Sequence, residues 1–295
     1  MQPLLVKLWQ PLVSGLSLGS IYALIAQGYY VTYITTGAMN FGQGEFLMIG
    51  ALFGFTCYLT LGLPYAVAAV AAALLVGLFG LALERGAIRP VMRHGLSLGW
   101  VLSTVAVSII LKNAAVQVWG PLQIKFPSPF GDKVIQIGPA GIFPQELFII
   151  VAALGTVFAV QVFLRRSLLG KALMAVAFNR NAAAVMGINV TRMAALAFGL
   201  SSVLAGIGGI LVAPVTFAWA YMGTVPGIKA FAAAIFGGLE NPIGILIGGL
   251  VIGVLEQVSG IINSNLKEGV TFLFVLLVLG IRPAGLMGRK EITKV

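Results

Sequence analysis

Long apolar stretches recur along the chain from Pro11 to Gly285, and short loops that contain basic residues separate them. A hydrocarbon core about 30 Å thick requires roughly 20 apolar residues per helix. Backbone groups in lipid must be satisfied within the segment, and the runs do not alternate as barrel strands do. The pattern therefore predicts an all-α, polytopic transmembrane helical bundle of about eight spans. The predicted windows are residues 11–35, 45–61, 64–83, 97–118, 146–164, 193–218, 242–261 and 269–286.

One further segment is apolar but shorter than a membrane span. Eight simple crossings would place both termini on one side, yet three predicted spans before the first basic loop place the N-terminus outside. An additional crossing is therefore needed. Residues 226–240, PGIKAFAAAIFGGLE, are the candidate, and we expect them to form a broken or half-helix.

Charge is scarce and lies at the ends of the spans. The chain is 59% hydrophobic and 9% charged with a mean hydropathy of +1.04, whereas soluble domains carry about a quarter charged residues. The net charge of +10 comes from scattered residues rather than a basic stripe with interleaved aromatics, which argues against nucleic acid as a partner. The positive-inside rule makes three segments cytoplasmic and the nearly neutral, irregular segment 119–145 external. The basic residues concerned are Arg85, Arg89 and Arg93; Arg165, Arg166, Lys171, Arg180 and Arg192; and Arg289, Lys290 and Lys294.

Glycines recur at four-residue spacing within the predicted spans. This spacing puts both glycines of a pair on one helix face, where two backbones can approach closely. Ordinary packing within the bundle and a specific subunit interface both fit the pattern. The pairs are Gly15 and Gly19, Gly50 and Gly54, Gly244 and Gly248, and Gly249 and Gly253.

Polar residues and clustered glycines interrupt the apolar pattern at residues 40–45 (NFGQGE) and 237–242 (GGLENP). Unwound backbone at membrane depth is tolerated only where protein or a watered cavity surrounds it, and paired interruptions often mark a transport path. We therefore expect a translocation pathway here, although two polar loops at the membrane surface would also fit. The candidate lining residues are Asn40, Gln43 and Glu45, with Ser17, Ser20 and Tyr22 facing them.

Lys112, Glu256 and, in the short segment 226–240, Lys229 are ionisable residues that would lie within the membrane. Such residues are costly in a membrane and usually functional. Glu256 could pair with Lys267 or reach the interface, and Lys229 could extend outward to the headgroups. An ion-driven carrier acting alone is the alternative function, with Glu45, Glu256 and Lys229 carrying protons or ions. A proton relay needs more buried carboxylates than the sequence offers.

Catalytic and cofactor-binding patterns are absent from the sequence. The single histidine, His94, excludes a two-histidine metal site, and the lone Cys57 excludes an intramolecular disulfide. No G-x-x-x-x-G-K-[ST] motif occurs, so the chain cannot bind ATP through a P-loop. We expect a transport subunit with no enzymatic activity, metal or cofactor, in which any ATP is bound by another polypeptide.

The basic segment 165–192 is the longest polar stretch between spans. Residues 168–178 and 182–186 are helix formers, the sequence Asn-Arg-Asn at 179–181 separates them, and Gly187 offers a helix stop. Small residues here leave a face that another protein could approach closely. The segment is predicted to be a short helical lever beyond the membrane, and a simple connecting loop is the alternative. The small residues are Gly170, Ala172, Ala175 and Ala177.

Six sequence segments resemble the LivH-type permease subunits of ABC importers for branched-chain amino acids. The segments are spread along nearly the whole chain, and together they are highly specific for this family. The segments are GLSLGSIYALIAQGY at 15–29, GAMNFGQGEFLMIGAL at 37–52, ERGAIRPVM at 84–92, SLLGKALMAVAFNRNAAAVMGIN at 167–189, GIKAFAAAIFGGLENPIGILIGG at 227–249 and RPAGLMGR at 282–289.

The resemblance implies one permease domain over residues 1–295 in the bacterial inner membrane. It also implies a second LivH- or LivM-like permease, two cytoplasmic ATPase subunits and a periplasmic substrate-binding protein as partners. The segment 165–192 would then supply the coupling helix that docks into an ATPase. The coupling residues expected from this are Gly170, Lys171, Ala172, Ala175, Asn179, Arg180 and Gly187.

Two departures from the family pattern affect this prediction. Gln43 stands where the family commonly has histidine, which alters the polarity of the expected pathway. Residues 179–181 carry no acidic side chain, whereas the family usually has one here, and this affects ATPase docking. Related importers carry urea, other amino acids or aromatic acids, so these remain alternatives to branched-chain or other hydrophobic amino acids as substrate.

Overall fold

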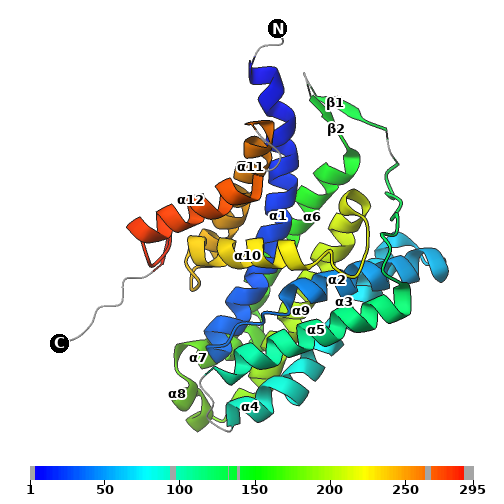
Figure 1. Cartoon of the computed structure of the whole chain (residues 1–295). Coiled ribbons are helices and arrows are strands. Elements are labelled where there is room, and N and C mark those ends of the chain that lie inside the picture. Colours follow the sequence, from blue (N-terminus) through cyan, green and yellow to red (C-terminus); the bar gives the residue numbers. More distant parts are fainter. Residues whose placement is uncertain (1–3, 94–97, 132, 138–139, 263–266, 289–295) are drawn as a thin grey trace.

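The computed structural model describes residues 4–93, 98–131, 133–137, 140–262 and 267–288, and it is a bundle of helices with one small hairpin (Figure 1). Two of its segments are π-helical turns, η1 and η2, which continue α2 and α3. The elements in chain order are α1 (Leu4–Thr36), α2 (Gln43–Phe55), η1 (Thr56–Thr60), α3 (Tyr65–Leu83), η2 (Glu84–Ile88), α4 (Arg89–Arg93), α5 (Gly99–Trp119), β1 (Ile135–Ile137), β2 (Ala140–Ile142), α6 (Pro144–Arg166), α7 (Leu168–Phe178), α8 (Arg180–Val185), α9 (Val190–Thr216), α10 (Thr224–Gly237), α11 (Pro242–Ile262) and α12 (Lys267–Ile281).

Six helical segments of the described chain are long and apolar enough to cross a membrane, against the eight predicted. The window at 45–61 becomes the 13-residue α2, which passes into the π-helical turn η1, and the window at 269–286 becomes the 15-residue α12. Pro283 follows the end of α12 closely and disfavours helical backbone just before it. The six are Leu8–Thr36, Tyr65–Met92, Gly99–Trp119, Pro144–Arg166, Val190–Thr216 and Pro242–Ile261.

The loops predicted to be cytoplasmic gather at one end of the bundle, which we call the basic end. Figure 1 shows α4, α7 and α8 together at the lower end, and the β1–β2 hairpin with the start of α1 at the opposite end. The lining of one cleft at the basic end includes Thr36, Arg89 and Arg180, which come from three different segments. Arg289, Lys290 and Lys294 lie outside the described residues. The segment 119–145, predicted as irregular, contains the antiparallel hairpin that the sequence did not indicate.

Glycines bring the long helices into close contact. A Cβ on Gly15 would lie 2.7 Å from Cα of Val254, and one on Gly19 would lie 2.8 Å from Cα of Leu250, so α1 and α11 touch through their backbones. Figure 1 shows these two helices side by side. Likewise Gly50 of α2 meets Gly206 of α9. Each predicted glycine pair therefore serves packing within this chain.

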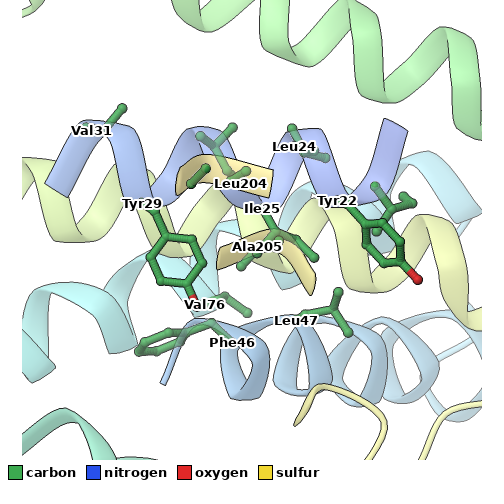
Figure 2. Packing of buried hydrophobic residues seen from close by; sticks show 14 of the residues in the cluster. Tyr22, Leu24, Ile25, Tyr29, Val31, Phe46, Leu47, Val76, Leu204 and Ala205 are labelled. Atoms are coloured by element: carbon green, nitrogen blue, oxygen red, sulfur yellow. The ribbon is translucent and has the colours of Figure 1, made fainter. Parts of the chain in front are cut away.

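The main apolar core lies between α1, α2, α3 and α9. In Figure 2 the ring of Tyr29 on α1 points toward Phe46 on α2, with Val76 of α3 beside them, and Leu204 of α9 belongs to the same cluster. These side chains are almost completely buried. Because lipid is as apolar as this core, close packing rather than a hydrophobic driving force holds such helices together. The core fixes the position of α2, the helix that begins at the first predicted interruption.

Candidate functional site

Two short helices, α2 and α10, begin beside each other inside the bundle. Residues 37–42 lead from the basic end into α2, and residues 217–223 lead from the opposite end into α10. A Cβ on either Gly44 or Gly223 would collide with the carbonyl oxygen of the other, and a Cβ on Gly227 would lie 2.9 Å from Cα of Gly44. The expected half-helix at 226–240 is thus confirmed as α10.

The second predicted interruption is present as a break between two helices. Residues 237–242 form the turn between α10 and α11, where Glu240 is exposed and the side chain of Asn241 accepts hydrogen bonds from the backbone at the start of α11. The counterpart of residues 37–42 is instead 217–223, which carries few polar side chains. Gly223 beside Thr224 is its only clear indication of a helix break in the sequence. The aromatic residues Phe217, Trp219 and Tyr221 keep the segment mostly apolar, so the hydropathy pattern does not reveal the break.

Asn40 and Gln43 form a closed polar network at the start of α2. The Asn40 side chain donates to Oε1 of Gln43 at 3.3 Å, and the Ser201 hydroxyl donates to the same oxygen at 3.1 Å. The Gln43 amide donates to the Ser201 carbonyl at 2.9 Å. All three residues are fully buried. The network therefore ties the first turn of α2 to the middle of α9, and sequence reasoning missed Ser201.

Glu45 pairs with Lys112 of α5, 3.0 Å between Oε1 and Nζ. The carboxylate stands in the first turn of α2, where the helix dipole favours a negative charge. The Glu45 side chain is buried, and Lys112 is about one fifth exposed. The prediction noted both residues but did not pair them, because they lie on different helices.

A larger charged cluster surrounds Lys229 in α10. Its Nζ lies 2.9 Å from Glu256 on α11 and 3.5 Å from Glu268 on α12. The Tyr22 hydroxyl donates to Glu256 at 2.8 Å, and Lys267 approaches Glu256 at 3.8 Å. The alternative that Lys229 reaches out to the headgroups is wrong, because its side chain is only 4% exposed.

Each of the two short helices forms an ion pair with an outer helix, and the charge on the short helix is negative in one case and positive in the other. Glu45 in α2 pairs with a cation on α5, and Lys229 in α10 pairs with an anion on α12, Glu268. In both cases the group on the short helix is buried and its outer partner is partly exposed. Helices α5 and α12 are therefore each tied to a short helix by an ion pair.

The structure does not bring the remaining pathway candidates to the start of α2. Ser20 donates its hydroxyl to the carbonyl of Leu16 in its own helix, and Tyr22 points to the Lys229 cluster. Ser17 is buried. Of the six residues predicted for the pathway, Asn40, Gln43 and Glu45 lie together, and these three α1 residues lie elsewhere.

The basic segment folds as two short helices at the basic end. Ser167 caps α7 by accepting from the Gly170 amide, and Asn179 caps α8 by accepting from the Ala182 amide, both near 3 Å. Gly187 ends the segment with φ +85°, which glycine adopts without strain. The predicted helix, break and stop are thus confirmed.

The exposed face of α7 and α8 differs from the predicted one. Gly170 is buried against the backbone of Phe163 and Leu164 in α6, so it does not lie on an open face. Ala172 and Ala175 are half-buried against the core. The open face instead carries mostly larger side chains, because the four predicted small residues are wholly or partly buried. The exposed residues include Leu168, Leu169, Lys171, Met174, Phe178, Arg180, Val185 and Met186, together with Asn179, Asn181, Ala182 and Ala184.

Comparison with known proteins identifies the family. Residues 12–279 match the family described as "Branched-chain amino acid transport system / permease component". The chain belongs to this family. It is 33% identical over 301 aligned positions to the high-affinity branched-chain amino acid transport system permease protein LivH of Salmonella typhimurium, with 97% of both chains covered. It is 34% identical to the corresponding protein BraD of Pseudomonas aeruginosa, again with 97% of both chains covered.

One solved structure, PsaBC from Streptococcus pneumoniae in complex with Fab, is similar over 92% of this chain and 91% of that chain. The sequence identity is 15% and the TM-score is 0.48.

Family membership makes the chain a transport permease that forms a translocation pathway across a membrane. This replaces the ion-driven carrier considered as an alternative. The charged residues named for that carrier are held in ion pairs with neighbouring helices. Among the described residues, no group of three or more His, Cys, Asp or Glu side chains could hold a metal ion.

Proposed function

We propose that the chain is the LivH-like permease of an ATP-binding-cassette importer for branched-chain or other hydrophobic amino acids. The relatives named above support the substrate class, since both match this chain almost from end to end. Its partners are a second, related permease, two ATPase subunits at the basic end and a periplasmic binding protein at the other end. The location is the bacterial inner membrane, with ATP hydrolysed only in the partner subunits.

We assign the coupling role to α7 and α8. The side chains of Phe178 and Val185 are 94% and 89% exposed at the basic end, beyond the long spans. Large apolar side chains in this position need a partner surface, because water solvates them poorly. A docked ATPase would cover them, and Lys171 and Arg180 at the margin supply charge for orientation. Asn179 and Gly187 act by shaping the two helices.

The pathway is assigned to the region where α2 and α10 begin. Glycine backbone forms the close contact between the two helix starts, so a small displacement of one helix from the other would open a path while breaking few side-chain contacts. Asn40, Gln43 and Glu45 would then line it. Alternating access needs two discrete packings that each partner biases, and the ion pairs to α5 and α12 would hold one of them.

Affinity purification of the tagged chain from native membranes tests the proposal. The expected result is co-purification of an ATPase pair and a second permease, with ATP hydrolysis in the eluate. Reconstitution with the companion binding protein should then give ATP-dependent uptake of L-leucine or a similar amino acid. A single protein without ATPase activity would contradict the assembly, and uptake of urea instead of amino acids would contradict the substrate.

A further inference from the structure

A cavity of about 730 Å³ opens at the basic end between the last turns of α1 and the inner side of α7. Tyr30, Tyr33 and Ile34 form one wall, and Met174 and Val176 of α7 form the other, with the exposed Phe178 at the rim. The two helices pack on each other here, and Figure 1 shows α7 beside the lower end of α1. The size falls within the range of about 300–1,000 Å³ typical of small-molecule sites.

Two charged residues of opposite sign belong to the lining of this cavity. Arg180 stands at the first position of α8, and Glu240 stands in the turn between α10 and α11. Neither side chain forms a salt bridge within the described parts of the chain, where the ion pairs involve other residues. The cavity thus offers a free cation and a free anion around a largely apolar and aromatic interior.

We propose that this cavity binds a zwitterionic α-amino acid with an aliphatic side chain. The guanidinium of Arg180 can take the carboxylate through two parallel hydrogen bonds, and the carboxylate of Glu240 accepts from the ammonium group. The apolar walls of the cavity contact the aliphatic side chain of the bound amino acid. Glu240 would repel a purely anionic ligand, and Arg180 would repel a purely cationic one. The pair therefore selects a ligand that carries both charges.

The site lies next to the segment assigned to coupling. A bound amino acid would contact α1 and α7 together and hold α7 in one position relative to the bundle. On the cytoplasmic side the ligand is the imported product, so the cavity is a product site. This identity of the ligand rests on the proposed function, whereas the preference for a zwitterion rests on the cavity.

Equilibrium binding of radiolabelled L-leucine to the purified permease–ATPase complex, without the binding protein, tests the inference. L-Leucinamide lacks the carboxylate and isocaproate lacks the ammonium group, so they serve as competitors. The complex should prefer L-leucine to either analogue by at least about tenfold. In preparations that have retained the ATPase, Arg180→Gln should weaken binding of L-leucine while leaving binding of L-leucinamide unchanged. Glu240→Gln should weaken binding of L-leucine while leaving binding of isocaproate unchanged. Arg192→Gln, an exposed cation at the same end outside the cavity lining, is the matched control.

Two outcomes would overturn the inference. One is the absence of saturable L-leucine binding to the complex, and the other is binding that neither variant alters. Uptake driven by the binding protein is measured separately on the same preparation. Normal leucine uptake without binding in the cavity would refute the product site alone, whereas loss of leucine uptake in the wild-type complex would refute the proposed substrate.

Discussion

Nζ of Lys229 lies 2.9 Å from Oε1 of Glu256, and the two side chains are only 4% and 7% exposed. The contact joins α10 to α11, and the hydroxyl of Tyr22 extends it to α1. Breaking a buried pair by removing one partner leaves an uncompensated charge, which is far costlier than losing the pair as a whole. The pair therefore holds α10 in the bundle as long as both members are present.

Glu256→Gln is expected to destabilise the protein by about 3–5 kcal/mol, because Lys229 would keep its charge without its nearest counter-ion. Thermal unfolding in detergent, followed by loss of the monodisperse elution peak, measures the effect. The double variant Lys229→Met with Glu256→Gln should recover part of the loss. Glu268→Gln, whose side chain is 60% exposed, is the matched control and should cost about 1 kcal/mol or less. Equal losses in the two single Glu variants would contradict the role of the buried pair.

Gly44→Ala is expected to abolish the folded protein or to displace α10, because a Cβ there would collide with the carbonyl of Gly223. The backbone on the other side cannot rotate away as a side chain could. Expression and thermal stability in detergent measure this. Gly155→Ala in α6 is the control, since nothing lies within 4 Å of its Cβ position, and it should change stability by about 1 kcal/mol at most. Wild-type stability in Gly44→Ala would show that the two helix starts are not in contact.

Phe178→Asp and Val185→Asp are expected to lose ATPase co-purification and uptake while the permease still folds. Both side chains are almost fully exposed, so a carboxylate there costs no internal packing but would oppose an apolar docking surface. Pull-down of the ATPase and size-exclusion chromatography measure the two effects. Ala175 is less suitable because it is half-buried against the core.

Leu122→Asp supplies the comparison for these two variants. Leu122 is also exposed, but it lies in the loop at the opposite end of the bundle. The same chemical change there should leave ATPase binding intact. Retention of the ATPase by both Phe178→Asp and Val185→Asp would contradict the proposal that the exposed face of α7 and α8 docks the ATPase.

Cysteines introduced at the basic end and at the hairpin end of the bundle are expected to be accessible from opposite sides of the membrane. Cys57 is the only native cysteine and is buried, so it gives little background. In right-side-out vesicles, a membrane-impermeant thiol reagent should label Leu122→Cys and spare Val185→Cys. Inside-out vesicles from which the ATPase has been stripped should give the reverse. Labelling of both positions from one side would contradict the arrangement of basic end inside and hairpin outside.

The sequence was sufficient for the class of fold and for the family. Apolar runs of about 20 residues can only satisfy their backbone groups in lipid as helices, whatever their neighbours are. The helix break at residues 179–181 and the stop at Gly187 were also readable, because caps and left-handed glycines act within a few residues. These features depend only on residues close in sequence, so the sequence alone is enough to predict them.

Tertiary structure decided which residues meet. Hydropathy measures polarity and not helix length, so the window at 269–286 predicted a full span where α12 has only 15 residues. The break at 217–223 was hidden because its residues are mostly apolar. The partners of Glu45 and Lys229 were fixed only when α5, α11 and α12 came to lie beside the short helices. The sequence shows which charged groups within the membrane need a counter-ion. Which residue serves as that counter-ion depends on how helices distant in sequence pack together.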